Sequence, residues 1–168
     1  MYRETYVKIL RNARDGSWEV TEALADNEAL STEFSNTFIS QSFRIIARAI
    51  QAREKLGFKR QIYFVHSGGW DHHDNLLTNH ANMLTGVDNA FNEFASALEE
   101  MGVFNQVTTF SISEFGRTLG SNGNGSDHAW GGNVMAMGGN VNGKELFGNY
   151  PYLASNGDRF LGNGIMIP

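Results

Sequence analysis

The sequence predicts an α/β protein with a mostly parallel sheet and flanking helices. Three observations lead to this expectation. Apolar residues recur at helical spacing in two segments, a short apolar run follows each segment, and the resulting order is helix, strand, helix, strand. Two strands joined through a helix of this length are almost always parallel, with a right-handed crossover.

The first helix is expected over about residues 35–56. Its apolar face consists of residues at three- and four-residue spacing: Phe38, Ile39, Phe43, Ile46, Ala49 and Ile50. Gly57 is well placed to end this helix in a left-handed conformation. Residues 1–33, which precede it, are polar and mixed, so we expect an irregular lead-in with a short helix around residues 18–24.

Two strands and a second helix complete the segment 34–112. The continuous apolar run Ile62–Val65 predicts a buried strand. A second helical stripe runs over Met83–Leu98 and is closed by Gly102. Val107–Ile112 is rich in β-branched and aromatic residues, which predicts another buried strand.

The C-terminal part, residues 113–168, is rich in glycine and asparagine, and we expect a site loop followed by short strands. Three Asn-Gly pairs indicate turns with left-handed backbone conformations: Asn122-Gly123, Asn124-Gly125 and Asn163-Gly164. Residues 134–137 predict one short strand. The whole chain, 1–168, is therefore expected to form a single domain, and its abrupt end indicates a partial one.

Composition narrows the class of partner. The net charge of −5 offers no electrostatic basis for binding nucleic acid, and no apolar run approaches membrane-spanning length. The absence of cysteine excludes disulfides, thiolate metal ligands and a cysteine nucleophile. A small anionic ester remains open as substrate, because a metal or an arginine can reverse the local field. The oligomeric state stays open.

The stretch HSGGWDHHDN, residues 66–75, contains three of the five histidines of the chain. Asp71 and His73 offer oxygen and imidazole donors, which suit zinc, manganese or iron. Residues two apart in an extended loop point the same way, so these two form the expected ligand pair while His72 points elsewhere. The alternative is a polar loop of hydrogen-bonded histidines.

A second loop, after the strand predicted at Val107–Ile112, carries four further candidates. Because parallel strands end at one edge of a sheet, this loop is expected to meet the first. Asp127 and His128 then form a second ligand pair; the alternative is a turn aspartate beside a surface histidine. Glu114 is a candidate metal ligand or general base, and Arg117 is a candidate residue for binding phosphate or sulfate. A local ion pair between Glu114 and Arg117 is the alternative for both.

Three strings, HSGGWDHHDN, SEFGRTLGSNGNGSDHAWGGN and GGNVNGKELFGNYP, resemble the bacterial DUF1501 proteins of the alkaline phosphatase/sulfatase-like superfamily. The resemblance runs from about residue 36 to the end. It implies a parallel α/β domain with metals at the carboxyl edge of the sheet, held by Asp71 with His73 and by Asp127 with His128. Members of the family are longer and begin with a twin-arginine export signal, so the resemblance also implies an internal or C-terminal fragment of a periplasmic protein.

Three departures from the superfamily pattern accompany this resemblance. The spacing Asp71-x-His73 is shorter than usual, and no histidine follows residue 128. Asp127 lies well past the strand predicted to end at Ile112, so Glu114 is an alternative occupant of its ligand position.

Together these residues predict a metal-dependent hydrolase of phosphate or sulfate esters, or a fragment of one that is inactive alone. Zinc is the first choice of metal, with manganese, iron and calcium open. The main alternative is a non-catalytic exported binding or scaffold protein that keeps the fold, with a structural metal or a hydrogen-bonded His/Asp cluster. A mononuclear iron or manganese site with redox chemistry is a third option.

Overall fold

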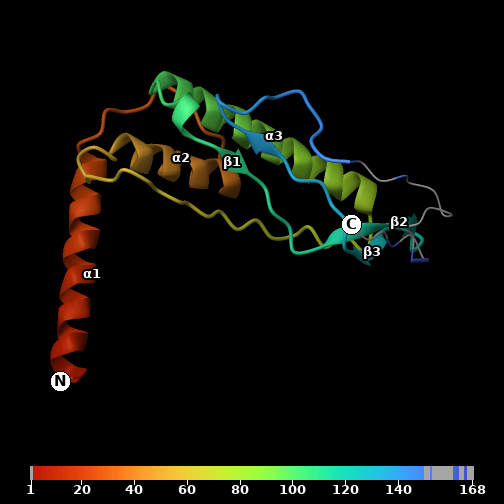
Figure 1. Cartoon of the computed structure of the whole chain (residues 1–168), viewed down its shortest axis with the longest axis horizontal. Coiled ribbons are helices and arrows are strands. Elements are labelled where there is room, and N and C mark those ends of the chain that lie inside the picture. The colour runs from red at the N-terminus through yellow and green to blue at the C-terminus, as the bar shows by residue number, and fades with distance from the viewer. Residues whose placement is uncertain (1, 150–151, 153–160, 163–164, 166–168) are drawn as a thin grey trace. The chain divides into compact units, whose positions relative to one another are not determined.

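The structure is a computed structural model that describes residues 2–149, 152, 161–162 and 165 (Figure 1). The described chain contains three α-helices, a short 3-10 helix at Phe104–Gln106 and four short strands. It divides into two compact units, one formed by Met1–His66 with Ala90–Met101 and the other by Ser67–Asn89 with Gly102–Pro168. The turn expected at Asn163-Gly164 lies outside the described residues.

Helix α1 belongs to the first unit and spans Tyr2–Ala25, so helix replaces most of the irregular lead-in expected there. Arg48 of helix α2 (Phe38–Gln51) anchors the C-terminal end of α1, because the Nη2 of Arg48 donates a hydrogen bond of 2.7 Å to the carbonyl oxygen of Leu24. Just beyond the helix, Asn27 Nδ2 donates to the carbonyl oxygen of Arg48 at 2.8 Å. No helix in the described part of the chain is long and apolar enough to cross a membrane.

The apolar core of the first unit lies between α2, which spans Phe38–Gln51, and the C-terminal part of α3. Phe43 stacks on Phe94, with ring centroids 4.7 Å apart, and meets Phe91 edge-on at 5.6 Å. The amphipathic helix expected here is therefore confirmed. The buried apolar side chains of this unit are Ala23, Phe43, Ala47, Ile50, Ala52, Ala90, Phe94, Ala97 and Leu98.

Helix α3 spans Leu76–Glu100 and begins earlier than the stripe that predicted it. Gly102 follows it with φ of 68°, a left-handed conformation that glycine adopts without steric cost. Gly57 has φ of 67° and ends the turns that continue from α2, where the amide of Phe58 donates to the carbonyl oxygen of Arg53 at 2.9 Å. Gly102 thus follows its helix as predicted, whereas α2 ends at Gln51 with Ala52 as its C-cap, so the prediction that Gly57 caps this helix was wrong.

The prediction of a mostly parallel sheet was wrong. The described strands are β1 at Thr109–Phe110, β2 at Gly116–Ser121, β3 at Ser126–Ala129 and β4 at Ala136–Met137. They form two separate antiparallel pairs, β1 with β4 and β2 with β3. β4 corresponds to the short strand expected at residues 134–137, and it pairs with β1.

The run expected as a buried strand, Ile62–Val65, carries no regular secondary structure. Ile62 is 98% exposed and Phe64 is 74% exposed. The physical reason is pairing: a strand is stabilised by hydrogen bonds to a neighbour, and tight turns bring antiparallel partners together more readily than a crossover does. An apolar run indicates a tendency to be buried, but it does not determine which other segment will form backbone hydrogen bonds with it.

Glu100, the last residue of α3, ties the segment before α2 to this helix within the first unit. Its Oε2 accepts hydrogen bonds from the hydroxyl of Thr32 at 2.6 Å and from the amide of Thr32 at 2.9 Å, and its Oε1 accepts from the amide of Ser31 at 2.6 Å. These bonds, the Thr32 hydroxyl first, lower the pKa of Glu100 from 4.5 to about 2.

We predict that Glu100→Gln lowers the urea midpoint of unfolding at pH 7, because a neutral amide accepts these bonds more weakly. The pKa is lower in the folded chain than in the unfolded chain, so this contribution to stability is complete above about pH 4.5 and is lost as pH falls toward about 2. The difference in midpoint between wild type and variant, followed by circular dichroism, should therefore shrink over that window. Glu99→Gln, at an exposed neighbour, is the control. A difference that does not change between pH 6 and pH 2.5 would contradict the prediction.

Candidate metal centre

The centre is built in the second unit, where a loop and an antiparallel ribbon meet. Asp71 and His73 lie on the loop before α3, and their side chains are exposed. His72 between them is turned inward and only 7% exposed. The alternation along this loop therefore places Asp71 and His73 on one side, as residues two apart in extended chain require.

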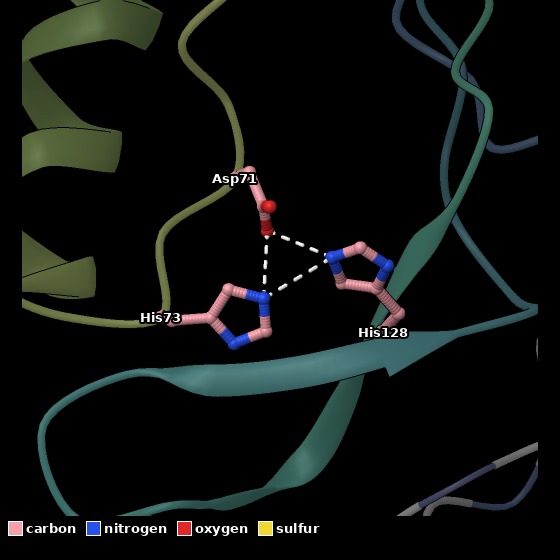
Figure 2. Close-up of side chains that lie close together, drawn as sticks. All are labelled: Asp71, His73 and His128. Carbon is pink, nitrogen blue, oxygen red and sulfur yellow. Dashed lines mark hydrogen bonds and ion pairs between the residues drawn. The ribbon is translucent and has the colours of Figure 1, made fainter.

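Three donor atoms converge in Figure 2. Asp71 Oδ1 lies 2.8 Å from His128 Nε2 and 3.0 Å from His73 Nε2, and the two Nε2 atoms are 3.2 Å apart. Asp71, His73 and His128 are the single group of three or more His, Asp or Glu side chains in the described residues whose ligand atoms lie within 4.8 Å of one another. Two residues from the loop and one from β3 thus form a compact donor triangle.

The register of the ribbon explains why His128 faces the loop. β2 and β3 pair so that Arg117 stands directly opposite His128. Side chains of directly opposed residues lie on the same face of an antiparallel pair. Both therefore reach Asp71, and Arg117 Nη2 lies 2.7 Å from the same Oδ1.

Arg117 connects the loop to the ribbon through three acceptors. Its Nη2 donates to Asp71 Oδ1 and, at 3.0 Å, to the carbonyl oxygen of Trp70. Its Nη1 donates at 2.6 Å to the carbonyl oxygen of Ser126 on β3. The side chain is 16% exposed. Its fork is thus engaged by the protein itself, and the binding of phosphate or sulfate by Arg117 stays a prediction.

The hairpin loop fits closely over the first loop at Gly125. A Cβ added to Gly125 would fall on backbone atoms of His72 and His73, so only glycine allows this approach. Next to it, the amide of Ser126 faces the carbonyl oxygen of His72 at 3.5 Å, and Asn122 Nδ2 donates to that of His73 at 3.4 Å. The Asn-Gly pairs predicted as turns form this hairpin loop.

Electrostatics keep Asp71 ionised. The hydrogen bond from His128 has the largest effect and lowers the pKa of Asp71; desolvation opposes it, and the hydrogen bond from Arg117 and the charge of His73 lower the pKa further. A carboxylate that stays charged is a metal ligand without first losing a proton.

Two other predicted site residues lie outside the triangle. Asp127, next to His128, places Oδ1 3.4 Å from Nδ1 of His73, the ring nitrogen that faces away from the triangle. Glu114 is exposed and forms no hydrogen bond or ion pair with the described residues, including the local pair with Arg117 considered as an alternative.

Sequence reasoning missed Phe115 and Asn122. The ring of Phe115 stacks on His128, with centroids 4.0 Å apart and an angle of 8°, while the guanidinium carbon of Arg117 lies 5.1 Å from the centre of the same ring. An aromatic residue two positions before an arginine in extended chain was an available signal, because both project to one side. Asn122 was interpreted as a turn residue only.

Beneath the loop, Trp70, His72 and His80 form a ring cluster. Trp70 and His80 meet edge-on with centroids 5.5 Å apart, and His72 lies 5.9 Å from His80. Burial lowers the pKa of His80, and repulsion from His72 and Arg117 adds to this effect. This cluster forms the inner support of the loop that carries Asp71 and His73.

The half-exposed triangle of two imidazoles and a carboxylate offers the mixed nitrogen and oxygen donors that suit divalent transition metals. Residues 10–159 match the family described as "Protein of unknown function (DUF1501)", and the chain belongs to this family. The resemblance seen in residues 66–75 and in the string ending SDHAWGGN is thereby confirmed at the level of the family. No curated protein and no solved structure matches the chain.

We predict that Arg117→Met destabilises the second unit by about 2–3 kcal/mol, because it removes hydrogen bonds to a carboxylate and to two carbonyl oxygens. Arg117→Lys should restore only part of the loss, since an ammonium group cannot match the planar fork. Hydrogen exchange measured by mass spectrometry should show lost protection in residues 67–76 and 122–129. Arg14→Met, at an exposed position of α1, is the control. Equal protection in the two methionine variants would contradict the structural role of Arg117.

Proposed function

We propose that Asp71, His73 and His128 bind one divalent metal, zinc in the first instance, and that the site hydrolyses phosphate or sulfate esters. The observation that carries this proposal is the convergence of the three donor atoms. The likeness of the pairs Asp71 with His73 and Asp127 with His128 to those of the alkaline phosphatase/sulfatase-like superfamily supports the substrate class. It lends no support to the parallel sheet, which the described fold lacks.

The distances within the triangle fit a metal. Zinc ligands lie at about 2.0–2.1 Å from the ion, so two of them are roughly 3.3–3.4 Å apart in a tetrahedron and closer in an octahedron. The three donor separations run from 2.8 to 3.2 Å. One carboxylate with two neutral imidazoles also offsets part of the charge of a divalent ion.

A divalent metal at such a site polarises a phosphoryl or sulfuryl oxygen and makes water a stronger nucleophile near neutral pH. We assign the nucleophile to water, and two hydroxyls of the second unit are already engaged by backbone carbonyl oxygens. Thr118 Oγ1 donates to the carbonyl oxygen of Gly120 at 2.8 Å, and Ser113 Oγ donates to that of Phe115 at 2.8 Å. Arg117 contributes by holding Asp71 in place.

A structural site in a non-catalytic binding protein is the second candidate. One observation favours it: Asp71 Oδ1 already interacts with His73, His128 and Arg117, so the cluster is connected internally through hydrogen bonds and ion pairs. Under this reading the cluster joins the loop to the ribbon and does not act on a substrate.

We predict that the wild-type chain retains one zinc per molecule after dialysis, measured by elemental mass spectrometry. Asp71→Ala and His128→Ala should each weaken binding by at least about 100-fold, since each removes a direct ligand where even outer partners are worth 10–100-fold. His66→Ala, which removes an exposed histidine of the other unit, should bind like wild type.

Hydrolysis of p-nitrophenyl phosphate and p-nitrophenyl sulfate, with and without zinc, tests the second half of the proposal. We expect zinc-dependent turnover of one of these esters that Asp71→Ala abolishes. A chain that holds no metal would overturn the metal site. A chain that binds zinc through these residues but turns over neither ester would overturn the hydrolase and favour the structural role.

A further inference from the structure

We infer that Asp127 is a positioning residue that holds His73 from outside the metal site and is not a ligand of the metal bound by Asp71, His73 and His128. This inference rests on the proposed metal site. It departs from the sequence prediction, in which the adjacent Asp127 and His128 act as a ligand pair.

The geometry of the His73 imidazole keeps Asp127 apart from the donor triangle. The two ring nitrogens of a histidine point outward on different sides of the ring, so one group cannot face both at once. His73 Nε2 lies in the donor triangle with Asp71 and His128. The Asp127 carboxylate lies 3.4 Å from the other nitrogen, Nδ1. The ring of His73 therefore separates Asp127 from the triangle.

Strand alternation places the side chains of Asp127 and His128 on opposite faces of β3. Asp127 and His128 are successive residues of β3. Successive side chains of a strand project to opposite faces. Because His128 projects toward Asp71, Asp127 projects to the other face, where it meets the far side of His73. Asp127 and His128, although adjacent in the strand, thus approach His73 from two different sides.

The Asp127 carboxylate is itself held in place. Its Oδ1 accepts a hydrogen bond of 3.1 Å from Asn122 Nδ2, and this amide also donates to the carbonyl oxygen of His73. The backbone amide of Asp127 donates to Thr118 Oγ1 at 3.1 Å. An oriented carboxylate beside the outer nitrogen of a metal-binding histidine fixes the ring and its tautomer, and such partners typically contribute 10–100-fold in metal affinity.

In this arrangement the carboxylate favours the tautomer with the proton on Nδ1, and Nε2 keeps its lone pair for the metal. The site then has three protein ligands instead of four. Three-ligand sites leave a position for water or substrate, whereas four protein ligands close a zinc site. Asp127 thus favours the catalytic reading of the centre over the structural one.

Zinc titration against a chromophoric chelator distinguishes a positioning residue from a ligand. Asp127→Ala should keep one zinc per chain with 10–100-fold weaker affinity, and Asp71→Ala should lose far more. Asp127→Asn should lie between wild type and Asp127→Ala, because its amide oxygen keeps a neutral acceptor beside Nδ1. Asp88→Ala removes an exposed carboxylate from α3 in the same unit and should match wild type.

Cobalt provides a readout that a general loss of stability would not change. With Co²⁺ bound, Asp127→Ala should keep the position and intensity of the visible absorption bands, because the direct ligands are unchanged. A change of spectrum, or a loss of affinity equal to that of Asp71→Ala, would show Asp127 to be a ligand and overturn the inference. An affinity equal to that of Asp88→Ala would overturn it as well.

Nitrogen-15 NMR of the metal-free chain tests Asp127 independently of the proposed metal site. Carboxylates lie beside both ring nitrogens of His73, Asp71 at Nε2 and Asp127 at Nδ1, so Asp127→Ala should shift the proton from Nδ1 toward Nε2 relative to wild type. If wild type binds no zinc, the proposed function fails while this measurement still decides the contact of Asp127 with His73. An unchanged tautomer in Asp127→Ala would overturn the contact itself.

Discussion

The bridge formed by Arg117 is the interaction on which the candidate centre depends. Its guanidinium joins the carboxylate of Asp71 and the carbonyl oxygen of Trp70 on one side to the carbonyl oxygen of Ser126 on the other. A loop and a two-stranded ribbon are not stable by themselves in water, and Arg117 joins them together with the close contact of Gly125 and the hydrogen bond from Asn122 to His73. The guanidinium is mostly shielded from solvent while the Asp71 carboxylate is half exposed, so the bonds of Arg117 to the two carbonyl oxygens are the better protected part of the bridge.

Helices α2 and α3 could be predicted from the sequence because their signal is local, whereas most of α1 was expected to be irregular. Apolar side chains at three- and four-residue spacing define the face that Phe43 shares with Phe94, and a glycine such as Gly102 ends a helix through its own backbone. Strand pairing is not local. Ile62 and Phe64 have the composition of a buried strand, yet composition carries no information on which segment donates and accepts the backbone hydrogen bonds.

The meeting of the two loops shows how an expected proximity can have a different physical cause. From the sequence, Asp71 is expected near His128 because parallel strands end at a common edge of the sheet. In the structure the cause is a hairpin: Gly125 allows close approach to His73, and the register of β2 with β3 turns Arg117 and His128 to the same face. The separate roles of Asp127 and His128 could not be seen before that strand was known, since alternation assigns adjacent residues to opposite sides.

The exposure of the triangle explains why its outer contacts matter. The side chains of Asp71, His73 and His128 are 53%, 50% and 48% exposed. At such exposure, solvent screens their mutual attraction, and pairs of this kind contribute little to stability by themselves. Their convergence must therefore come from the layer beneath and beside them, where His72 is buried, Phe115 stacks on His128 and Arg117 spans both elements. The donors are thus held in place by their neighbours while they remain about half exposed, and this arrangement is compatible with the metal site that we propose.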